Sequence, residues 1–543
     1  MPPRSKYEFV KTRTDAMMST RYNYESVWQS IADNLFGRRD FTSSRTPGQN
    51  RKSRIYDDTA SQMLDMLAGA MQSLLVNPAE RWFALRFENA ELNDSSEASV
   101  WLKSVEVRMD HAIKAATANF NSQVAETFID LIGFGTGGLF IDDVPGIGLQ
   151  FSNRPLQELY VMEDAAGIVV GVARCFKLTA DQAVEKFGDK AKTATRAIDR
   201  KGFEDRHDYR QLITKNKDQK PGRLDASGMP WSSLIISVED KAVMSEGGFR
   251  EMPLITPRWT KEPGEIYGRG SGHNALSCGG GLNEQKKTAY MAGQLAVAPP
   301  RIMENEAVLG SDVSFAPHAL IIVDTTSSQM NPPIQELRSS TRFDISKTLL
   351  TMDQESVRAA FHWPLLQALQ DARMTATQVL ELSAQTQRHL APILGRIQTE
   401  FLDPIIDRVF AIEARGGRLP PMPAELSGIA ADYTVDYKSA AFNAQKTNSA
   451  KLVIDFSSAV ANLSAVDQGV LDVVNFDEGV RELGMALDVP PSMLNSPQQV
   501  EEKRQASREL AEEQAAAQEM AQSVDNISKL QKTQSTPNNN AVA

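Results

Sequence analysis

Residues 133–138, GFGTGG, carry the glycine spacing of a dinucleotide-binding loop. Gly133, Gly135 and Gly138 form the pattern G-x-G-x-x-G, which works when a strand precedes it and a helix follows, so that the helix N-terminus meets the pyrophosphate. Here the apolar spacing predicts a helix before the glycines, and LFIDD predicts a strand after them. Because the order is reversed, we expect a helix C-terminus that turns into a strand through left-handed residues, and no cofactor site.

A second glycine-rich segment, YGRGSGHNALSCGGGLNEQKK at 267–287, does precede a predicted helix. It lacks the Gly-Lys-Ser/Thr of a phosphate-binding loop. Each of the three consecutive glycines at 279–281 costs about 1 kcal/mol in a helix interior. The segment therefore predicts a break between a short helix at 273–278 and the next helix, and a joint is favoured over a phosphate site.

The remaining reactive side chains form no recognisable catalytic or metal-binding set. The spacing of the six histidines suits no metal, and no nucleophile or kinase motif is present. The two cysteines, Cys175 and Cys278, are expected to be free thiols in a reducing cytosol, with a single disulfide as the alternative. We predict no catalytic residue, no metal and no cofactor, and hence no enzyme. The histidines are His111, His207, His273, His318, His362 and His389.

Length and composition are typical of a folded protein with several domains. The chain has 543 residues, 41% hydrophobic and 23% charged. A net charge of −11 argues against a protein that coats nucleic acid, although a local DNA-facing surface stays compatible with it. No apolar run reaches the ~20 residues of a membrane span, and the N-terminal residues lack the apolar core of a signal peptide. We expect a cytoplasmic product with no membrane partner.

The first half of the chain alternates predicted helices with strands. Residues 5–37 predict a helix with an apolar face that includes Tyr22, Trp28, Ile31 and Leu35. A second helix follows, capped by Asp58 and ended by Asn77-Pro78. Further elements are a strand at RWFALRF, two helices over 97–133, and mostly strands and loops over 145–260.

The second half predicts two helices that flank a β-containing insert of about forty residues, followed by a long helix. The two helices cover LNEQKKTAYMAGQLAVA and SSTRFDISKTLLTMDQESVRAAF, and the long one covers 374–414. Pro392 and Pro404 predict kinks in the long helix, because proline removes a backbone donor. Its apolar face consists of Leu390, Leu394, Ile397, Phe401, Ile405 and Val409.

Four stretches, in this order along the chain, resemble the portal (head-to-tail connector) proteins of short-tailed, podovirus-type bacteriophages. They are IYDDTASQMLDMLAGAMQSLLVNPAERWFALRF, IYGRGSGHNAL with LNEQKKTAYMAGQLAVAPPRIM, RMTATQVLELSAQTQRHLAPILGRIQTEFLDPIIDRVF, and LDVPPSMLNSPQQVEEKRQ. Three places depart from the family pattern: Gln378 stands where Glu is usual, Ala391-Pro392 where Gly-Pro is usual, and Gly279-Gly280-Gly281 where a proline is common.

The resemblance implies an α+β, mainly helical portal fold with a wing, a two-helix stem, a β-containing clip and a helical crown, assembling as a ring of usually twelve copies. The implied parts are 1–265, N-terminal wing; 266–298, wing–stem joint and first stem helix; 299–337, clip; 338–361, second stem helix; 362–373, tunnel loop; 374–442, long helix and C-terminal wing; 443–500, crown; and 501–543, a polar helix and then a disordered tail.

The function implied by the resemblance is a DNA channel at one capsid vertex of the virion. Double-stranded DNA would be packaged through it by the large terminase and later ejected. Other implied partners are the major capsid, scaffolding and tail adaptor or nozzle proteins, with assembly in the cytoplasm of the bacterial host. A nucleotide-dependent DNA-processing enzyme and a minor capsid or scaffolding protein remain as alternatives.

The acidic net charge suits a conduit, because tight phosphate contacts would hinder sliding DNA. We expect a few weak contacts, with Lys286 and Lys287 on the first stem helix and Lys347 on the second as candidates. The alternative for each lysine is a solvated or intersubunit charge. In the tunnel loop, Gln367 and Gln370 are further channel candidates, and Trp363 is expected to anchor the loop in the wing.

Overall fold

A computed structural model gives the arrangement of most of the chain, which divides into two compact units. Unit 1 is Met1–Ala84, Val105–Leu419 and Val435–Ala441; unit 2 is Leu85–Ser104, Pro420–Thr434 and Phe442–Ala543. The described residues are 5–42, 49, 55–89, 92, 96–223, 225–304, 316–323, 334–336, 343–363, 390–423, 433–437, 454–460, 474–476, 479–480, 483, 500–510, 514 and 520. The elements below are those of these residues, and the chain is a mixture of helices and strands.

The N-terminal helix α1, Lys6–Ile31, continues directly into a π-helix, η1, Ala32–Phe36. Ser5 caps α1 by accepting a hydrogen bond from the backbone N–H of Glu8. The predicted apolar face is confirmed at Trp28, Ile31 and Leu35, which are buried. It is wrong at Tyr22, which is 72% exposed.

Helix α2, Thr59–Leu75, matches the second predicted helix, but its capping residue differs from the prediction. Asp58 occupies the N-cap position and its side chain makes no cap hydrogen bond. The carboxylate of Asp57 accepts the backbone N–H of Thr59 instead, at 2.8 Å. The one-residue shift arises because Asp57 is buried and also serves two other elements, as shown below.

The next predicted elements are confirmed in order. The strand RWFALRF contains β1, Phe83–Phe87, which pairs with β13, Tyr433–Tyr437. Helices α4, Ser96–Lys114, and α5, Phe120–Phe134, follow. The strand predicted at LFIDD is β2, Leu139–Val144, the centre of a small sheet ordered β3-β2-β9, with β3 Gly148–Asn153 and β9 Leu254–Ile255.

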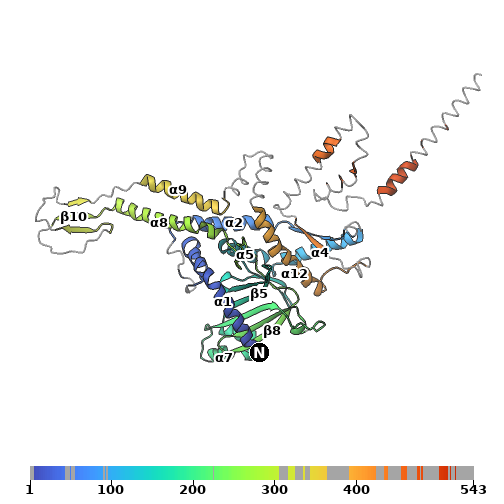
Figure 1. Ribbon diagram of the computed structural model, residues 1–543, viewed down its shortest axis with the longest axis horizontal. Helices are drawn as coiled ribbons and strands as arrows, with labels where there is room; N and C mark the ends of the chain where they lie inside the picture. Colours follow the sequence, from blue (N-terminus) through green and yellow to red (C-terminus); the bar gives the residue numbers. More distant parts are fainter. Residues whose placement is uncertain are drawn as a thin grey trace, which may run out of the picture. The chain divides into compact units, whose positions relative to one another are not determined.

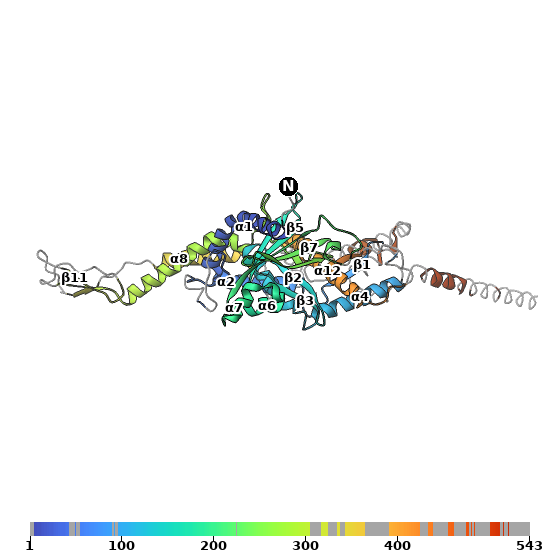
Figure 2. The same cartoon turned by 90° about the horizontal axis from the view of Figure 1, so that it is seen from below.

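A five-stranded antiparallel sheet forms the centre of the β-rich region, in the order β4-β5-β6-β7-β8. Helix α1 lies on one side of it, and α6, Ala180–Phe187, and α7, Lys192–Asp199, lie on the other (Figure 2). Three short 3₁₀ segments connect these elements: η2 Leu156–Glu158, η3 Gly188–Lys190 and η4 Ala226–Gly228. The strands are β4 Leu159–Glu163, β5 Val169–Thr179, β6 Arg206–Lys215, β7 Trp231–Ser237 and β8 Ala242–Phe249.

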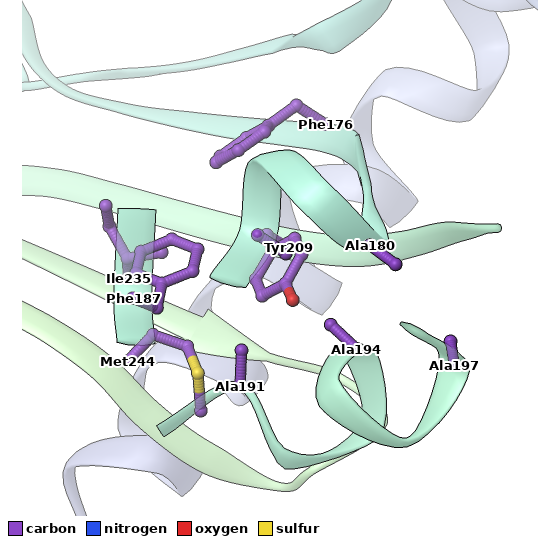
Figure 3. Packing of buried hydrophobic residues seen from close by; sticks show 10 residues of the cluster. Phe176, Ala180, Phe187, Ala191, Ala194, Ala197, Tyr209, Ile235 and Met244 are labelled. Atoms are coloured by element: carbon purple, nitrogen blue, oxygen red, sulfur yellow. The ribbon is translucent and has the colours of Figure 1, made fainter. Parts of the chain in front are cut away.

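The two faces of the sheet bury different kinds of side chain. On the α6–α7 face, Phe176 and Tyr209 of the sheet meet Phe187 and the small Ala194, and the alanines let α7 lie close to the strands (Figure 3). On the α1 face, Val10 and Met17 pack among sheet residues that include Leu212. Because successive side chains of a strand point to opposite faces of the sheet, the same strands supply apolar side chains to the α1 layer and to the α6–α7 layer. The sheet is therefore a rigid, doubly covered support.

Helix α8, Ser271–Val297, is one continuous helix, and the predicted break at the three glycines is wrong. Helix α9, Phe343–Ala360, lies beside α8 (Figure 1). We call α8 and α9 the helix pair. Between them in sequence lie β10 Arg301–Glu304, β11 Leu320–Val323 and β12 Ile334–Glu336, a three-stranded sheet ordered β11-β10-β12. The predicted β-containing insert is thus confirmed.

The long predicted helix is described from residue 390 onward. It is helical over 390–397, passes through a π-helix η5, Gln398–Leu402, and continues as α12, Asp403–Arg415. All six residues of its predicted apolar face are buried. Pro404 lies in the first turn of α12, so the irregularity predicted from this proline takes the form of a π-helical turn directly before it.

Candidate functional site at the base of the helix pair

The two glycine-rich segments singled out by their nucleotide-loop spacing pack against each other. Gly135 ends α5 in the left-handed region, at φ +88, and its N–H donates to the carbonyl of Leu131. A Cβ on Gly135 would lie 2.2 Å from the carbonyl oxygen of Gly268, and a Cβ on Gly268 would lie 2.2 Å from that of Gly135. Each loop fills the space a ligand would need.

The same close approach continues into the start of α8. A Cβ on Gly270 would meet the carbonyl oxygen of Ile132, and one on Gly272 would meet that of Gly133, both at 2.2 Å. The C-terminal carbonyls of α5 thus face the N-terminal turn of α8. The negative end of one helix dipole therefore lies beside the positive end of the other, which is electrostatically favourable. We call Gly133, Gly135, Gly268, Gly270 and Gly272 the glycine seam. It joins α8 to the part of unit 1 outside α8, α9 and the β10–β12 sheet, which we call the body.

The glycines inside α8 have a different environment. A Cβ on Gly279 would lie 2.1 Å from Cδ2 of Leu35, whereas Cβ atoms on Gly280 and Gly281 would meet no atom of this chain within 4 Å. Burial of Gly279 and Leu282 against the body holds this stretch helical. The packing offsets the ~1 kcal/mol cost of each glycine, which explains why the predicted break is absent.

A polar cluster around Asp57 joins the helix pair to the start of α2. Oδ2 of Asp57 accepts hydrogen bonds from Nζ of Lys286 on α8 at 2.8 Å and from Nε2 of Gln354 on α9 at 3.0 Å. Oδ1 of Asp57 accepts the backbone N–H of Thr59. Asn283 of α8 accepts the backbone N–H groups of Tyr56 and Asp57. We call Asp57, Asn283, Lys286 and Gln354 the Asp57 cluster.

The electrostatics of the cluster keep Asp57 charged although it is only 6% exposed. Burial by itself would raise the pKa of the Asp57 carboxyl, but hydrogen bonds from Lys286, Thr59 and Gln354 outweigh burial and hold the pKa below its usual value. A buried carboxylate with a full set of donors is a strong local constraint, because losing one partner leaves a charge uncompensated. The cluster can therefore fix the positions of three helices together.

The predicted channel lysines occupy three different environments. Lys286 belongs to the Asp57 cluster and forms an ion pair within its own subunit. Lys287 lies one residue on and pairs with Glu284 at 3.4 Å on the more exposed side of α8. Lys347 is exposed on α9. Sequence reasoning treated the three as equivalent, whereas the structure separates Lys286 from the others.

The predicted tunnel-loop residues lie only partly within the described chain. Trp363 is half-buried just after α9, and Gln367 and Gln370 lie outside the described residues. The buried residue at this point is Phe361, 1% exposed, whose ring meets that of Phe36 edge to face. Phe361, missed from the sequence, fixes the end of α9 to η1.

The outer part of the helix pair exposes large apolar side chains. They are Tyr290 (57%), Met291 (52%) and Val297 (89%) on α8, and Leu349 (48%) and Met352 (59%) on α9. Exposed apolar side chains gathered on two adjacent helices are typical of an interaction surface. We call these five residues the apolar stripe.

Sequence reasoning also missed Asp57 and Gln354 as members of a site. The only signal at Asp57 was its place beside a predicted helix start, which suggested a cap. Its partners lie 229 and 297 residues away in the chain, and residue spacing carries no information about such contacts.

The remaining reactive groups of the described chain include the side chains that can bind metals and two thiols. Among the described residues, no group of three or more His, Cys, Asp or Glu side chains could hold a metal ion. Cys175 and Cys278 are free, as expected, and burial raises the pKa of the Cys175 thiol to about 12. No helix in the described ranges is long and apolar enough to cross a membrane.

Comparisons with known proteins agree with the resemblance inferred from the sequence. The family described as "Bacteriophage head to tail connecting protein" matches residues 8–494. The chain is 26% identical to the "Probable portal protein" of Bordetella phage BPP-1, covering 98% of this chain and 96% of that protein. It is 26% identical to the "Portal protein" of Salmonella phage epsilon15, covering 95% and 94% respectively. The chain therefore belongs to the bacteriophage head-to-tail connecting, or portal, proteins.

Proposed function

We propose that this portal protein assembles as a closed ring, of twelve copies, that forms the DNA channel at one capsid vertex. The genome would enter through it, driven by the large terminase, and leave through it at ejection. The ring would contact the major capsid and scaffolding proteins and the tail adaptor or nozzle proteins. It would act without catalysis of its own, as a virion component assembled in the host cytoplasm.

The observation that carries the ring proposal is the apolar stripe. Its five side chains lie on the part of the helix pair beyond the Asp57 cluster. Leaving large apolar side chains in water forgoes about 1.5–3 kcal/mol each relative to full burial. A neighbouring copy of the same helix pair would cover them. Head-to-tail contacts of this kind close into a ring when the rotation between subunits allows it.

The parts of the subunit follow from this proposal. The helix pair would be the stem, within 266–298 and 338–361, and β10–β12 would lie in the clip, 299–337. The long helix and the rest of 374–442 would complete the wing begun by 1–265. Residues 362–373 would form the tunnel loop, 443–500 the crown, and 501–543 a polar helical and then disordered tail.

Lys287 and Lys347 are the better channel candidates among the three lysines. Both lie on the helix pair without a buried ion-pair partner among the described contacts, since the partner of Lys287, Glu284, is exposed. Lys286 contributes mainly to the Asp57 cluster. Gln367 and Gln370 remain proposed DNA contacts, which would be weak because their side chains are uncharged.

The test of the ring is negative-stain microscopy of the purified full-length chain. We expect rings with a central hole. Met291→Asp combined with Met352→Asp should abolish rings while leaving the subunit folded, because the two charges would be buried at each subunit contact. Ile168→Asp is the matched control, since Ile168 is similarly exposed, at 62%, on the turn between β4 and β5. A wild-type chain that stays monomeric, or forms open assemblies only, would contradict the proposal.

The tunnel loop has a separate test. Deletion of residues 362–372 should leave rings intact and impair DNA packaging or retention in complemented phage. Loss of ring assembly in this variant would show that the segment supports the subunit contacts instead. A nucleotide-dependent enzyme has no supporting observation, because the two glycine segments occupy each other's space.

A further inference from the structure

We propose that Asp57 is the positioning residue of the helix pair: it is a side chain of the body that hydrogen-bonds to both α8 and α9, and it thereby sets their direction. This inference rests on the proposed role of the helix pair as the stem of a ring. It assigns the control of stem direction to one buried carboxylate on the segment before α2.

The position of the cluster along α8 supports the assignment. The body contacts α8 through Gly270 and Gly272 of the seam, then through Gly279 and Leu282, and finally through Asn283 and Lys286. Among the described residues, no side-chain hydrogen bond or ion pair to the body is found on α8 beyond Lys286. The helix continues to Val297, about 16 Å further at 1.5 Å per residue.

The contacts of α9 with the body support the same assignment. This helix ends against the body at Phe361, which packs on Phe36. Gln354, about two turns earlier, donates to Asp57 and so joins α9 to the body on the outer side of Phe361. Between the two helices, Nε2 of Gln285 donates to Oδ2 of Asp353 at 2.8 Å. A tilt of either helix about its inner contacts must therefore stretch a bond to Asp57.

The negative charge of Asp57 strengthens the hydrogen bonds by which it holds the two helices. One oxygen, Oδ2, receives both the ammonium of Lys286 and the amide of Gln354, so the two helices share a single acceptor. Hydrogen bonds to an ionised acceptor are shorter and about twice as strong as neutral ones. Because Asp57 is buried, water does not readily replace either donor. An amide at this position would turn its own NH₂ group either to the backbone N–H of Thr59 or to both Lys286 and Gln354, and in either orientation it would lack the charge.

The experiment measures the direction of the helix pair in assembled protein. Spin labels at Ser19→Cys on α1 and Gln294→Cys on α8, in a full-length chain with Cys175→Ala and Cys278→Ala, report the distance between body and helix pair. Labelled subunits are diluted with unlabelled ones so that most rings contain a single labelled copy. Circular dichroism and negative-stain images of the same samples report folding and ring formation.

We expect Asp57→Asn to broaden or shift the distance distribution, while Asp58→Asn, the exposed neighbouring carboxylate, leaves it unchanged. Lys286→Gln combined with Asp57→Asn should restore the wild-type distribution, because two amides can again pair. This rescue separates positioning by the ion pair from a general structural need for Asp57. Gln354→Leu should broaden the distribution less than Asp57→Asn and serves as the test if Asp57→Asn does not fold.

An unchanged distribution in folded Asp57→Asn protein would overturn the proposal, as would an unchanged distribution in Gln354→Leu if the first variant does not fold. A double variant that stays as broad as Asp57→Asn would contradict the pairing of residues 57 and 286 as the contact that sets the direction. Absence of rings in the wild-type sample would contradict the ring instead, and the label distances would still decide the role of Asp57 in the subunit.

Discussion

The glycine seam and the glycines within α8 use the same residue type for opposite reasons. In the seam, main chains from α5 and from the start of α8 approach so closely that a Cβ at Gly135, Gly268, Gly270 or Gly272 would lie 2.2 Å from a carbonyl oxygen. At Gly280 and Gly281 a Cβ would meet open space. The difference shows that a glycine-rich string indicates neither a ligand site nor a hinge until the atoms around it are known.

The largest loss of stability is expected when a methyl group is added to the glycine seam. Gly135→Ala should destabilise the folded subunit by about 4 kcal/mol or more, since it combines a left-handed backbone with a clash against main-chain atoms of Gly268 and Arg269. Urea denaturation of the full-length chain measures the change. A loss below about 1 kcal/mol would show that the two loops can separate at little cost.

The seam should also respond to acid, through His273 at the start of α8. Nδ1 of His273 accepts the backbone N–H of Gly270 at 3.1 Å, and burial, with a smaller contribution from Arg269, lowers the pKa of His273 to about 4. The unfolded chain binds a proton near pH 6.5 and the folded one does not, so stability is full above 6.5 and falls as the pH drops towards 4. The loss reaches about 3 kcal/mol.

Thermal unfolding between pH 7.5 and pH 4 measures this effect, with His273→Gln as the matched variant. Glutamine can still accept the Gly270 N–H but does not titrate, so this variant should lose less stability than the wild type over the same range. Equal pH dependence in the two proteins would exclude His273 as the source.

Gly279 lies between the two extremes and should give an intermediate effect. The atom that a Cβ here would meet is the end of a flexible side chain, Cδ2 of Leu35, which can move aside. We expect Gly279→Ala to destabilise by about 1–3 kcal/mol through overpacking, partly offset by better helix propensity. Leu35→Ala combined with Gly279→Ala should cost less than the sum of the single changes, and denaturation of all three variants tests this coupling.

The smallest effect is expected at the open glycines, and its sign is reversed. Gly280→Ala and Gly281→Ala should each stabilise the isolated subunit by up to about 1 kcal/mol, because alanine is the better helix former. Denaturation at a subunit concentration too low for rings measures it. If both variants destabilise, the comparison with the seam fails. If they stabilise the subunit but prevent rings, a neighbouring subunit needs the open space.

The parts of the fold set by local pattern were predictable. Periodic apolar residues indicated α2, α5 and the buried face around Phe401, and alternation indicated the strand at 83–87. The order of a helix before the glycines at 133–138 and a strand after them was predictable as well. These features depend on residues within a few turns of one another, which is the range over which side-chain periodicity reports burial.

The features that the sequence did not predict depend mainly on contacts between residues that lie far apart in the chain. Helix α8 is continuous despite its low local helix propensity, because Gly279 packs against Leu35, far away in the sequence, and Leu282 is buried. The Asp57 cluster and the seam join residues more than a hundred positions apart, so no spacing rule could reveal them. Tyr22 is exposed because it lies about 100° around α1 from Arg21, which occupies the buried face of the helix at that turn.

The π-helical turn at 398–402 has a consequence for the changes in length that this helix can accommodate. Such a turn contains one residue more than an α-helical turn, and here it lies next to Pro404. Removing one residue there would let the turn close as a regular α-helical turn, so the apolar faces of 390–397 and α12 would stay in line. The same deletion within α12 would instead rotate the residues on its two sides by about 100° relative to each other, by the 3.6-residue period.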